Sequence, residues 1–395
     1  MFDILPIKGG LDNVKGFFSG GVSVGLKSGG KKDAAFIRSD ELCDVGAVFT
    51  ANKFQAAPIK HFKRYGEIFQ TNFILINSKN ANAMTGAAGI DDINKIFSQL
   101  PSFLKAENPV MSSTGVIGCR LDTDKIIKAF ELFDFNGKNS DAAAQAIMTT
   151  DRFKKEIAVR VDIEGKGSFH AAAICKGAGM INPSLATMLC FIATDASVPK
   201  ELITTLLKDA AEESFNAISV DGDTSTNDTV MLISSGKSGV WDKEAFMEAL
   251  KFLTKYLALE IVRDGEGSKK VVAFEVKNAL TLDEAKKAAK ALSNSLLVKT
   301  ALFGEDPNWG RIASTIGASG IACDEDKLSI YYDDILAYSP EKKQFDSASE
   351  AACAKVMKKE SFKILCDLGM GDKSYTAYGC DLGHEYVNIN ADYRS

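Results

Sequence analysis

The sequence predicts an α+β protein in which mixed β-sheets are covered by layers of helices. Stretches with the apolar pattern of strands recur along the chain and are separated by stretches with helical spacing. Two predicted strands, at 156–163 and 168–175, are joined by a short glycine turn and therefore form an antiparallel hairpin. Other predicted strands are separated by whole helices, which permits parallel pairing as well. The combination indicates mixed sheets.

Composition and charge narrow the class of protein. With 395 residues, 46% hydrophobic and 25% charged, the chain is typical of a soluble protein with two domains or one large layered domain. The net charge of −5 predicts no basic surface for nucleic acid. No apolar run of about 18 residues occurs and the start lacks the pattern of a signal peptide, so we expect no membrane partner. Eight scattered cysteines favour reduced thiols, a cytoplasmic protein and no metal site.

The elements up to the hairpin follow from apolar spacing. Helices are expected at 92–104 and 122–133, where apolar residues recur with helical spacing. In 156–163, apolar residues occupy every second position, as in a half-buried strand. Residues 164–167 form the turn, and 168–175 form the returning strand.

The elements after the hairpin alternate between buried strands and helices. Residues 187–193 are apolar after the first position and predict a fully buried strand. A helix is expected from about Pro199, a residue that suits a first turn, because the following apolar residues fall on one face. The remaining expected elements are a strand at 229–234, a helix at 244–261, a strand at 271–276 and a helix opened by the capping box of Thr281 and Glu284.

The loop between the hairpin and the buried strand carries the most informative residue, Thr187. It follows the small residue Ala186 in a glycine-rich segment that begins at Lys176. A threonine hydroxyl is a poor nucleophile unless a base lies beside it, and cutting the chain in front of the threonine frees an α-amine that can serve as this base. We therefore hypothesise that Thr187 is a nucleophile and that the chain cuts itself between Ala186 and Thr187. The alternative is a structural threonine at the start of a strand.

Several other loops are candidates for parts of a site. Ser112–Gly118 is rich in hydroxyls and glycines, so it is either an oxyanion hole or a plain turn. Thr149–Asp151 is a weak capping signal just before the hairpin. The acidic loops at 263–267 and 304–311 are bracketed by glycine or arginine and would bind an amino group or simply be solvated.

The densest polar stretch, Val220–Asp228, has a different set of interpretations. Its Asp-x-Asp start resembles the loop of Mg²⁺-dependent phosphatases, with Asp221 as nucleophile and Asp223 beside it, although Ser225 is unusual at the fifth position. A calcium loop is excluded, because Thr226 stands where glycine is needed. A structural network of Asx and Ser/Thr turns is the simpler interpretation.

Taken together, these segments resemble the ornithine acetyltransferase family, the ArgJ or glutamate N-acetyltransferase proteins of arginine biosynthesis, over nearly the whole chain. The segment Lys176–Met180 with Ala186–Leu189 is highly specific. The other matching motifs are Gly46–Thr50 with Ala56–Pro58, Asn80–Gly86, Ser113–Gly118, Thr149–Asp151, Asp221–Thr229, Asp264–Gly267, Gly304–Arg311 and Asn388–Ser395.

The resemblance implies an αββα-like fold and self-cleavage into an α chain, 1–186, and a β chain, 187–395, which fold together and stay associated. It implies that Thr187 accepts the acetyl group of N2-acetylornithine and passes it to glutamate in a ping-pong reaction. Thr114 and Gly115 match the oxyanion-hole pair of the family. The positions that match its substrate-binding residues are Thr150, Lys176, Thr187, Glu266, Asn390 and Ser395.

These implied roles agree with the chemistry of the residues. A lysine can pair with a substrate carboxylate, and a glutamate with the ammonium group of ornithine. Ser395 replaces the usual terminal threonine of the family, which keeps the hydroxyl and loses a methyl group. The resemblance further implies an α2β2 assembly and no cofactor, and it leaves open whether acetyl-CoA is a second acetyl donor.

Three alternatives to acetyl transfer remain open from the sequence. A self-processing amidase or aminopeptidase would use the same nucleophile but release the acyl group to water. A Mg²⁺-dependent phosphatase would use Asp221 and Asp223. A non-catalytic amino-acid-binding protein would never free Thr187.

Overall fold

The computed structural model describes residues 1–182, 188–342 and 345–392, which form two compact units. The first unit comprises Met1–Gly177, Pro183–Asn216 and Thr224–Ala258. The second unit comprises Ala178–Asn182, Ala217–Asp223 and Leu259–Ser395. Each unit contains residues from both sides of the predicted cut, so the units do not coincide with the two predicted pieces of the chain.

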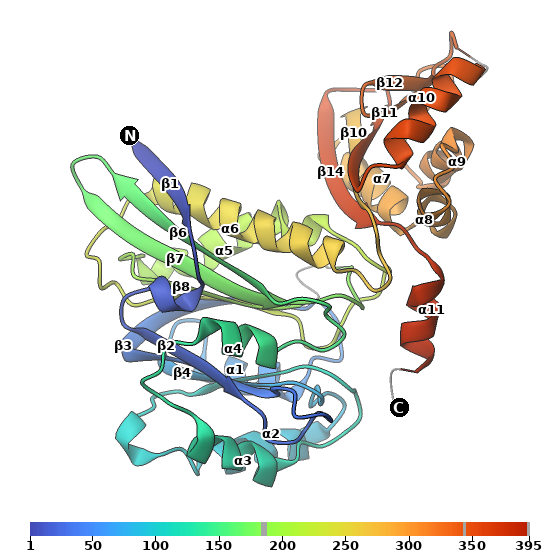
Figure 1. The fold of residues 1–395 in the computed structure, drawn as a ribbon. Helices are drawn as coiled ribbons and strands as arrows, with labels where there is room; N and C mark the ends of the chain where they lie inside the picture. The colour runs from blue at the N-terminus through green and yellow to red at the C-terminus, as the bar shows by residue number, and fades with distance from the viewer. Residues whose placement is uncertain (183–187, 343–344, 393–395) are drawn as a thin grey trace. The chain divides into compact units, whose positions relative to one another are not determined.

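Within the described residues, the first unit is built on a nine-stranded mixed sheet (Figure 1). The strand order is β1-β6-β7-β8-β9-β3-β4-β5, and β2 pairs with β3 beside this path. The strands are β1 Phe2–Ile7, β2 Phe17–Val22, β3 Ala34–Phe49, β4 Gln70–Asn77, β5 Val110–Ser113, β6 Lys155–Ile163, β7 Gly167–Lys176, β8 Leu189–Thr194 and β9 Thr229–Ser234.

The strands β8 and β9 lie in the middle of this sheet. They pair in parallel, and every residue of both strands is buried. Their outer neighbours, β7 and β3, pair with them antiparallel. Strands that are buried on both faces carry apolar residues at nearly every position, which explains the continuous apolar runs in the sequence.

Helices cover both faces of this sheet (Figure 1). Side chains alternate between the faces of β7: Ile174 belongs to a buried cluster with residues of α4, whereas Phe169 packs against Phe246 of α6 with ring centroids 5.8 Å apart. The α-helices that begin in the first unit are α1 Ala57–Phe62, α2 Gly86–Phe97, α3 Thr123–Leu132, α4 Ser140–Ala146, α5 Lys200–Glu212 and α6 Lys243–Arg263. Four 3-10 turns accompany them: η1 Leu11–Asn13, η2 Lys63–Tyr65, η3 Ser102–Leu104 and η4 Phe215–Ala217.

The second unit has its own mixed sheet, in the order β12-β11-β13-β10-β14. β10 pairs in parallel with β13 and antiparallel with β14. The strands are β10 Val271–Ala279, β11 Ser329–Tyr332, β12 Ile335–Tyr338, β13 Ser361–Asp367 and β14 Lys373–Cys380. The helices are α7 Leu282–Asn294, α8 Leu296–Phe303, α9 Trp309–Ala318, α10 Ser347–Met357 and α11 His384–Ala391.

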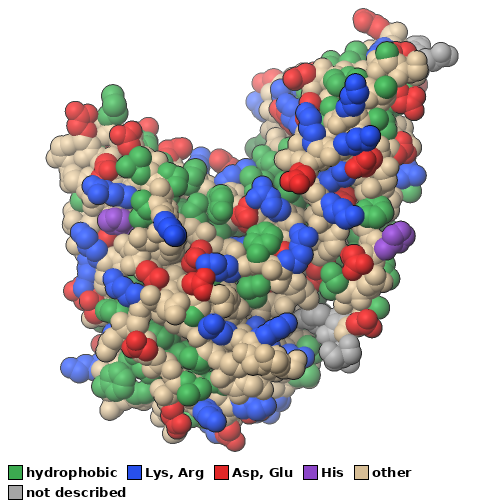
Figure 2. Space-filling view, viewed as in Figure 1, with side chains coloured by type: hydrophobic (Ala, Val, Ile, Leu, Met, Phe, Trp, Pro, Cys, Tyr) green, Lys and Arg blue, Asp and Glu red, His purple; other side chains and the backbone are tan. Residues whose placement is uncertain are grey.

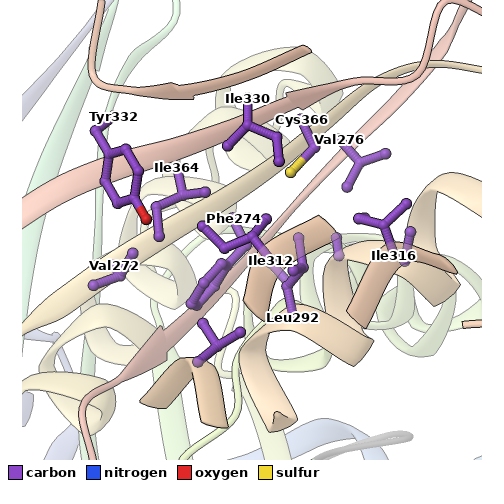
Figure 3. Close-up of a cluster of buried hydrophobic side chains, with 14 of the residues drawn as sticks. Val272, Phe274, Val276, Leu292, Ile312, Ile316, Ile330, Tyr332, Ile364 and Cys366 are labelled. Carbon is purple, nitrogen blue, oxygen red and sulfur yellow. The ribbon is translucent and has the colours of Figure 1, made fainter. Parts of the chain in front are cut away.

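The core of the second unit lies between its sheet and the helices α7 and α9 (Figure 3). Phe274 of β10 and Ile364 of β13 meet Leu292 of α7 and Ile312 of α9, and all four side chains are buried. Burial of side chains of this size stabilises a fold by about 1.5–3 kcal/mol each. This core keeps the second unit compact.

The α+β class with mixed sheets and helical layers is confirmed. The predicted hairpin is β6 with β7, and the predicted strand at 229–234 has the bounds of β9. Helix α7 begins at the predicted capping box, in which Thr281 and Glu284 exchange both hydrogen bonds.

Both predicted ends of the helix at 92–104 are wrong. The helix expected at 92–104 begins earlier, at Gly86, and ends at Phe97. Pro101 follows, and a proline both lacks the N–H that a helix needs and restricts the residue before it, so the helix cannot continue to residue 104. Helix α5 begins at Lys200, which confirms the start expected at about Pro199, although Pro199 itself occupies the N-cap and not the first turn.

The surface carries charges of both signs. On the face drawn in Figure 2, Lys and Arg side chains are intermixed with Asp and Glu side chains. Of the eight cysteines, all free, six are buried. None of the helices in the described residues is both long enough and apolar enough to cross a bilayer.

Candidate active site

Lys176 is held at the end of β7, beside the start of β8. It pairs in register with Leu189, and only 8% of its surface is exposed. The carbonyl of Met188, the residue after Thr187, accepts the N–H of Thr229 at 2.8 Å. The strand that follows the predicted nucleophile is therefore fixed on both sides, by β7 and by β9. Thr187 itself lies outside the described residues.

A buried aspartate, Asp151, holds this end of β7. Its carboxylate accepts hydrogen bonds from Lys155 Nζ at 2.8 Å, from the N–H of Gly177 at 2.8 Å and from the N–H of Thr149 at 2.9 Å. Burial opposes ionisation of the carboxyl, but the positive charges of Lys155 and Lys176 outweigh it and hold the pKa of Asp151 below its usual range. Asp151 therefore remains ionised and holds Gly177, the residue after Lys176, and Thr149, the residue before Thr150.

Lys27 supports the turn that carries Thr150. Its Nζ donates to the carbonyls of Ala146 at 3.3 Å and Met148 at 2.7 Å. Burial lowers the pKa of Lys27 to about 8, although the charges of Asp33 and Asp151 act in the opposite direction. The turn between α4 and β6 is therefore held in place just before Thr150.

Thr114 and Gly115 follow β5 in a tight turn. Gly115 has φ +128°, and a Cβ placed there would lie 2.2 Å from the carbonyl of Lys79. Only glycine fits this backbone and this close approach. In the described part of the chain, the N–H of Gly115 meets no hydrogen-bond acceptor, so it is available to a ligand, as an oxyanion hole requires.

Asn227 links this turn to the middle of the sheet. Its Nδ2 donates to the carbonyl of Ser113 at 2.8 Å and to the carbonyl of Ala81 at 2.5 Å. Asn227 lies two residues before β9, whose first residue, Thr229, is bonded to Met188. The side chain of Asn227 and the hydrogen bond between Thr229 and Met188 therefore connect the predicted oxyanion turn to the residue after Thr187.

Glu266 and Asn390 come together in the second unit. Asn390 Nδ2 donates to Glu266 Oε2 at 2.6 Å. The N–H of Glu266 donates to the carbonyl of Ala178 at 3.0 Å. A Cβ on Gly179 would lie 2.4 Å from the same carboxylate, so the backbone approaches Glu266 as closely as a glycine allows.

Asp221 is engaged with the backbone. Its carboxylate accepts the N–H groups of Met180 at 2.5 Å, Ile181 at 2.8 Å and Asp223 at 3.2 Å, and the hydroxyl of Tyr386 at 3.3 Å. Burial raises the pKa of the Asp221 carboxyl against the effect of these N–H groups. Both of its oxygens are occupied, which favours the structural turn network over a phosphatase nucleophile.

Comparison with known proteins identifies the chain. The ArgJ family model matches residues 19–395. The chain belongs to the ArgJ family. The "Arginine biosynthesis bifunctional protein ArgJ" of Wolinella succinogenes is 56% identical over 396 residues, 100% of both chains. The "Glutamate N-acetyltransferase" of Methanococcus maripaludis is 43% identical over 395 residues, which cover 93% of this chain and 96% of the relative.

A solved structure matches as well. The arginine biosynthesis bifunctional protein argJ from Bacillus halodurans is 38% identical, with a TM-score of 0.49, over 52% of this chain and 99% of that chain. The resemblance to the ArgJ family seen in the sequence is confirmed by the family model, and with it the enzyme class, an acyltransferase.

The structure brings together some of the predicted ArgJ site residues. In the first unit, the Asn227 side chain donates to the carbonyl of Ser113, the residue before Thr114, and Lys176 pairs in register with Leu189 at the start of β8. In the second unit, Glu266 and Asn390 are in direct contact. Ala186, Thr187 and Ser395 lie outside the described residues, so their assigned roles stay predictions.

Sequence reasoning missed the residues that hold this site. In the sequence, Asp151 is only the last residue of a weak capping signal, and Asn227 is one of several polar residues in its loop. Asn227 had no local signal, because its partners lie more than a hundred positions away. Asp151 had one clue: Lys155 follows it by four residues and is in phase with the apolar positions of the strand predicted at 156–163.

We expect Gly115→Ala to abolish most acyl-transfer activity. The new Cβ would meet the backbone of Lys79, which cannot move aside, so the turn of Thr114 and Gly115 would shift. Loss of one oxyanion donor lowers kcat by about a hundredfold or more. The matched control is Gly118→Ala, where φ is +86° but no atom lies within 4 Å. It should cost only backbone strain of about 1 kcal/mol in unfolding free energy; equal activity of the two variants would contradict the assignment.

We expect Asp151→Asn to lower the free energy of unfolding at pH 7 by about 3–5 kcal/mol, because it removes one charge of the buried ion pair between Asp151 and Lys155. The control is Asp141→Asn, which removes an exposed partner of Lys154 and should cost under about 1 kcal/mol. Urea unfolding measures both.

This loss should depend on pH in a defined direction. The pKa of Asp151 is lowered in the folded chain, so its contribution is complete above the unfolded pKa of about 3.9 and is lost as pH falls through the lower folded value. The difference between wild type and Asp151→Asn should therefore narrow below about pH 4. A difference that stays constant down to pH 2 would count against an ionised Asp151.

Proposed function

We propose that this ArgJ protein moves an acetyl group from N2-acetylornithine to glutamate through an acetyl ester on Thr187. Family membership and the 56% identity with a relative named for arginine biosynthesis support the reaction. The observation that carries the proposal is the chain of contacts from Met188 through Thr229 and Asn227 to the carbonyl of Ser113. It ties the residue after the nucleophile to the residue before the oxyanion pair.

The nucleophile is prepared by self-cleavage. The Thr187 hydroxyl adds to the carbonyl carbon of Ala186, and the peptide C–N bond breaks as the nitrogen takes up a proton. One water molecule then hydrolyses the resulting ester. The products are a carboxylate on Ala186 and a free α-amine on Thr187, and this amine becomes the base for the hydroxyl of the same residue.

Transfer then proceeds in two half-reactions. The Thr187 hydroxyl loses its proton to the α-amine and attacks the acetyl carbonyl of N2-acetylornithine. The N–H of Gly115 and the hydroxyl of Thr114 stabilise the oxyanion, a contribution of about 3 kcal/mol for one donor. The C–N bond breaks and ornithine leaves with the proton. The amine of glutamate attacks the acetyl ester in the same way and regenerates Thr187.

The substrate-binding roles follow the matches to the family. Lys176 pairs with a substrate carboxylate, and Glu266 pairs with the side-chain ammonium group of ornithine. Thr150, Asn390 and Ser395 complete the set. The buried position of Lys176 supports its role, because a desolvated ammonium group binds a carboxylate more strongly than an exposed one.

The two pieces produced by cleavage stay associated. After a cut before Thr187, β8 and β9 would belong to the second piece and their neighbours β7 and β3 to the first. Separation would break two full strand pairings inside a buried sheet. Two such pairs of pieces form the α2β2 assembly.

A transfer assay separates this function from hydrolysis. Purified protein is incubated with N2-acetylornithine with and without glutamate, and ornithine release is measured. Release that requires glutamate supports transfer, and release without glutamate supports an amidase. Glutamate acetylation with acetyl-CoA as sole donor tests the second donor, which the name of the Wolinella succinogenes relative, "bifunctional", favours for this chain.

We expect Thr187→Ala to abolish both cleavage and transfer, because the hydroxyl and the α-amine of residue 187 carry both reactions. Intact-mass measurement should find the full-length chain for the variant and the pieces 1–186 and 187–395 for wild type. The control is Thr194→Ala, at the far end of β8. A cut Thr187→Ala chain would disprove the nucleophile, and an uncut, active wild type would disprove self-cleavage.

A further inference from the structure

The loop between β2 and β3, residues 23–33, carries an excess of positive charge. Lys27, Lys31 and Lys32 lie within six positions, against a single acidic residue, Asp33. Within the described residues, none of the three ammonium groups is in an ion pair. Lys27 Nζ donates to three carbonyls, and Lys32 Nζ donates to the side-chain amide of Gln145 at 3.1 Å.

The one carboxylate of the β2–β3 loop is turned inward. Asp33 is fully buried and accepts the N–H groups of Val24 at 2.7 Å, Leu26 at 2.6 Å and Lys27 at 2.9 Å. Three such bonds fix the base of the loop and occupy the charge of Asp33. The lysines at the other side of the loop are therefore held by a rigid support.

The tip of the β2–β3 loop is open. All four residues from Ser28 to Lys31 are exposed. The N–H groups of Ser28, Gly29 and Gly30 meet no acceptor within the described residues. Gly29 and Gly30 have φ +70° and +67°, and a Cβ at either would meet no atom within 4 Å. Free N–H groups beside ammonium groups are the donors that a phosphate group requires.

The base of the loop lies beside the predicted oxyanion turn. The carbonyl of Asp33 accepts the N–H of Ser78 at 2.9 Å. The residue before Ser78 is Asn77, which pairs with Ser113 of β5 and accepts the N–H of Thr114 at 3.0 Å. Both turns are in the first unit, so this neighbourhood belongs to one compact part of the chain.

A second contact places the loop beside Thr150. Lys27 Nζ donates to the carbonyl of Met148 at 2.7 Å, two residues before Thr150. The β2–β3 loop therefore contacts the supports of two segments that carry predicted site residues, and its basic tip is exposed next to them.

We propose that the β2–β3 loop binds the phosphate groups of acetyl-CoA, with Lys31 and Lys32 as the charged donors. This inference rests on the proposed function, in which acetyl-CoA is a second acetyl donor. Acetyl-CoA carries a diphosphate and a 3′-phosphate, joined to its thioester by a long flexible arm. The phosphate groups must therefore be held beside the turn that stabilises the oxyanion, where compact ammonium groups serve as point charges. N2-acetylornithine has no phosphate and does not need the loop.

The test variant is Lys31→Ala combined with Lys32→Ala in the full chain. We expect its KM for acetyl-CoA to rise about tenfold or more, because hydrogen bonds to a charged group are lost. Its kcat and KM for transfer from N2-acetylornithine should stay at wild-type values, which also shows that the variant is folded. S-acetylpantetheine, the same thioester without phosphate, should be used equally by the variant and by wild type.

The matched control is Lys15→Ala combined with Lys200→Ala, which removes two exposed lysines of the same unit. Lys15 precedes β2, at the opposite end of the β2–β3 pair from the loop. The control should keep the wild-type KM for acetyl-CoA. An equal rise in both double variants would show that overall charge sets this KM, and would overturn the site.

Calorimetric titration measures binding without turnover. CoA should bind wild type and should bind the Lys31→Ala, Lys32→Ala variant about tenfold or more weakly. The difference should shrink as salt is raised, because exposed charges are screened. ATP tests whether any polyphosphate is bound: an affinity equal to that of CoA would overturn the assignment to acetyl-CoA.

The outcomes separate the loop from the proposed function. If wild type does not transfer acetyl groups from N2-acetylornithine to glutamate, the proposed function fails. If wild type makes this transfer but neither binds CoA nor uses acetyl-CoA, the second donor and the loop site are overturned together. If it uses acetyl-CoA and the variant keeps the same KM, only the loop site is overturned.

Discussion

The parallel pairing of β8 with β9 is the constraint on which the arrangement of the site depends. Both strands are buried on both faces, so a shift of one residue would move every side chain to the wrong face. The register is therefore fixed, and with it the position of Met188 opposite Thr229. The positions of the polar residues just outside the strand ends are therefore fixed as well.

Charge is the second constraint on this end of the sheet. The single carboxylate of Asp151 faces the ammonium groups of Lys155 and Lys176. Burying these charges is costly, and the ion pair of Asp151 with Lys155 offsets part of that cost. A substrate carboxylate, as in the proposed reaction, would add a partner for the ammonium group of Lys176.

The sequence predicted more of the fold than of the site. Strands such as 229–234 could be located because the continuous apolar run of a doubly buried strand is a local signal. The helix expected at 92–104 instead spans Gly86–Phe97, because apolar spacing continues past Pro101 although a proline cannot stand inside a regular helix. The candidate site residues could be recognised from the motifs that they match. The residues that hold them in place are found only through long-range contacts, such as that of Asn227 with Ala81. Periodicity carries no information about which distant loops meet, so only a fold can show those contacts.

The way the chain alternates between the two units has a consequence at the level of the gene. The second unit takes Ala178–Asn182 and Ala217–Asp223 from the middle of the first before its own run begins at Leu259. A single crossover at Leu259 would transfer Glu266 and Tyr386 but leave behind Ala178 and Asp221, their hydrogen-bond partners. The second unit therefore cannot be exchanged between relatives as a cassette without breaking these contacts. Substitutions in the segments that contact one another must therefore be inherited together.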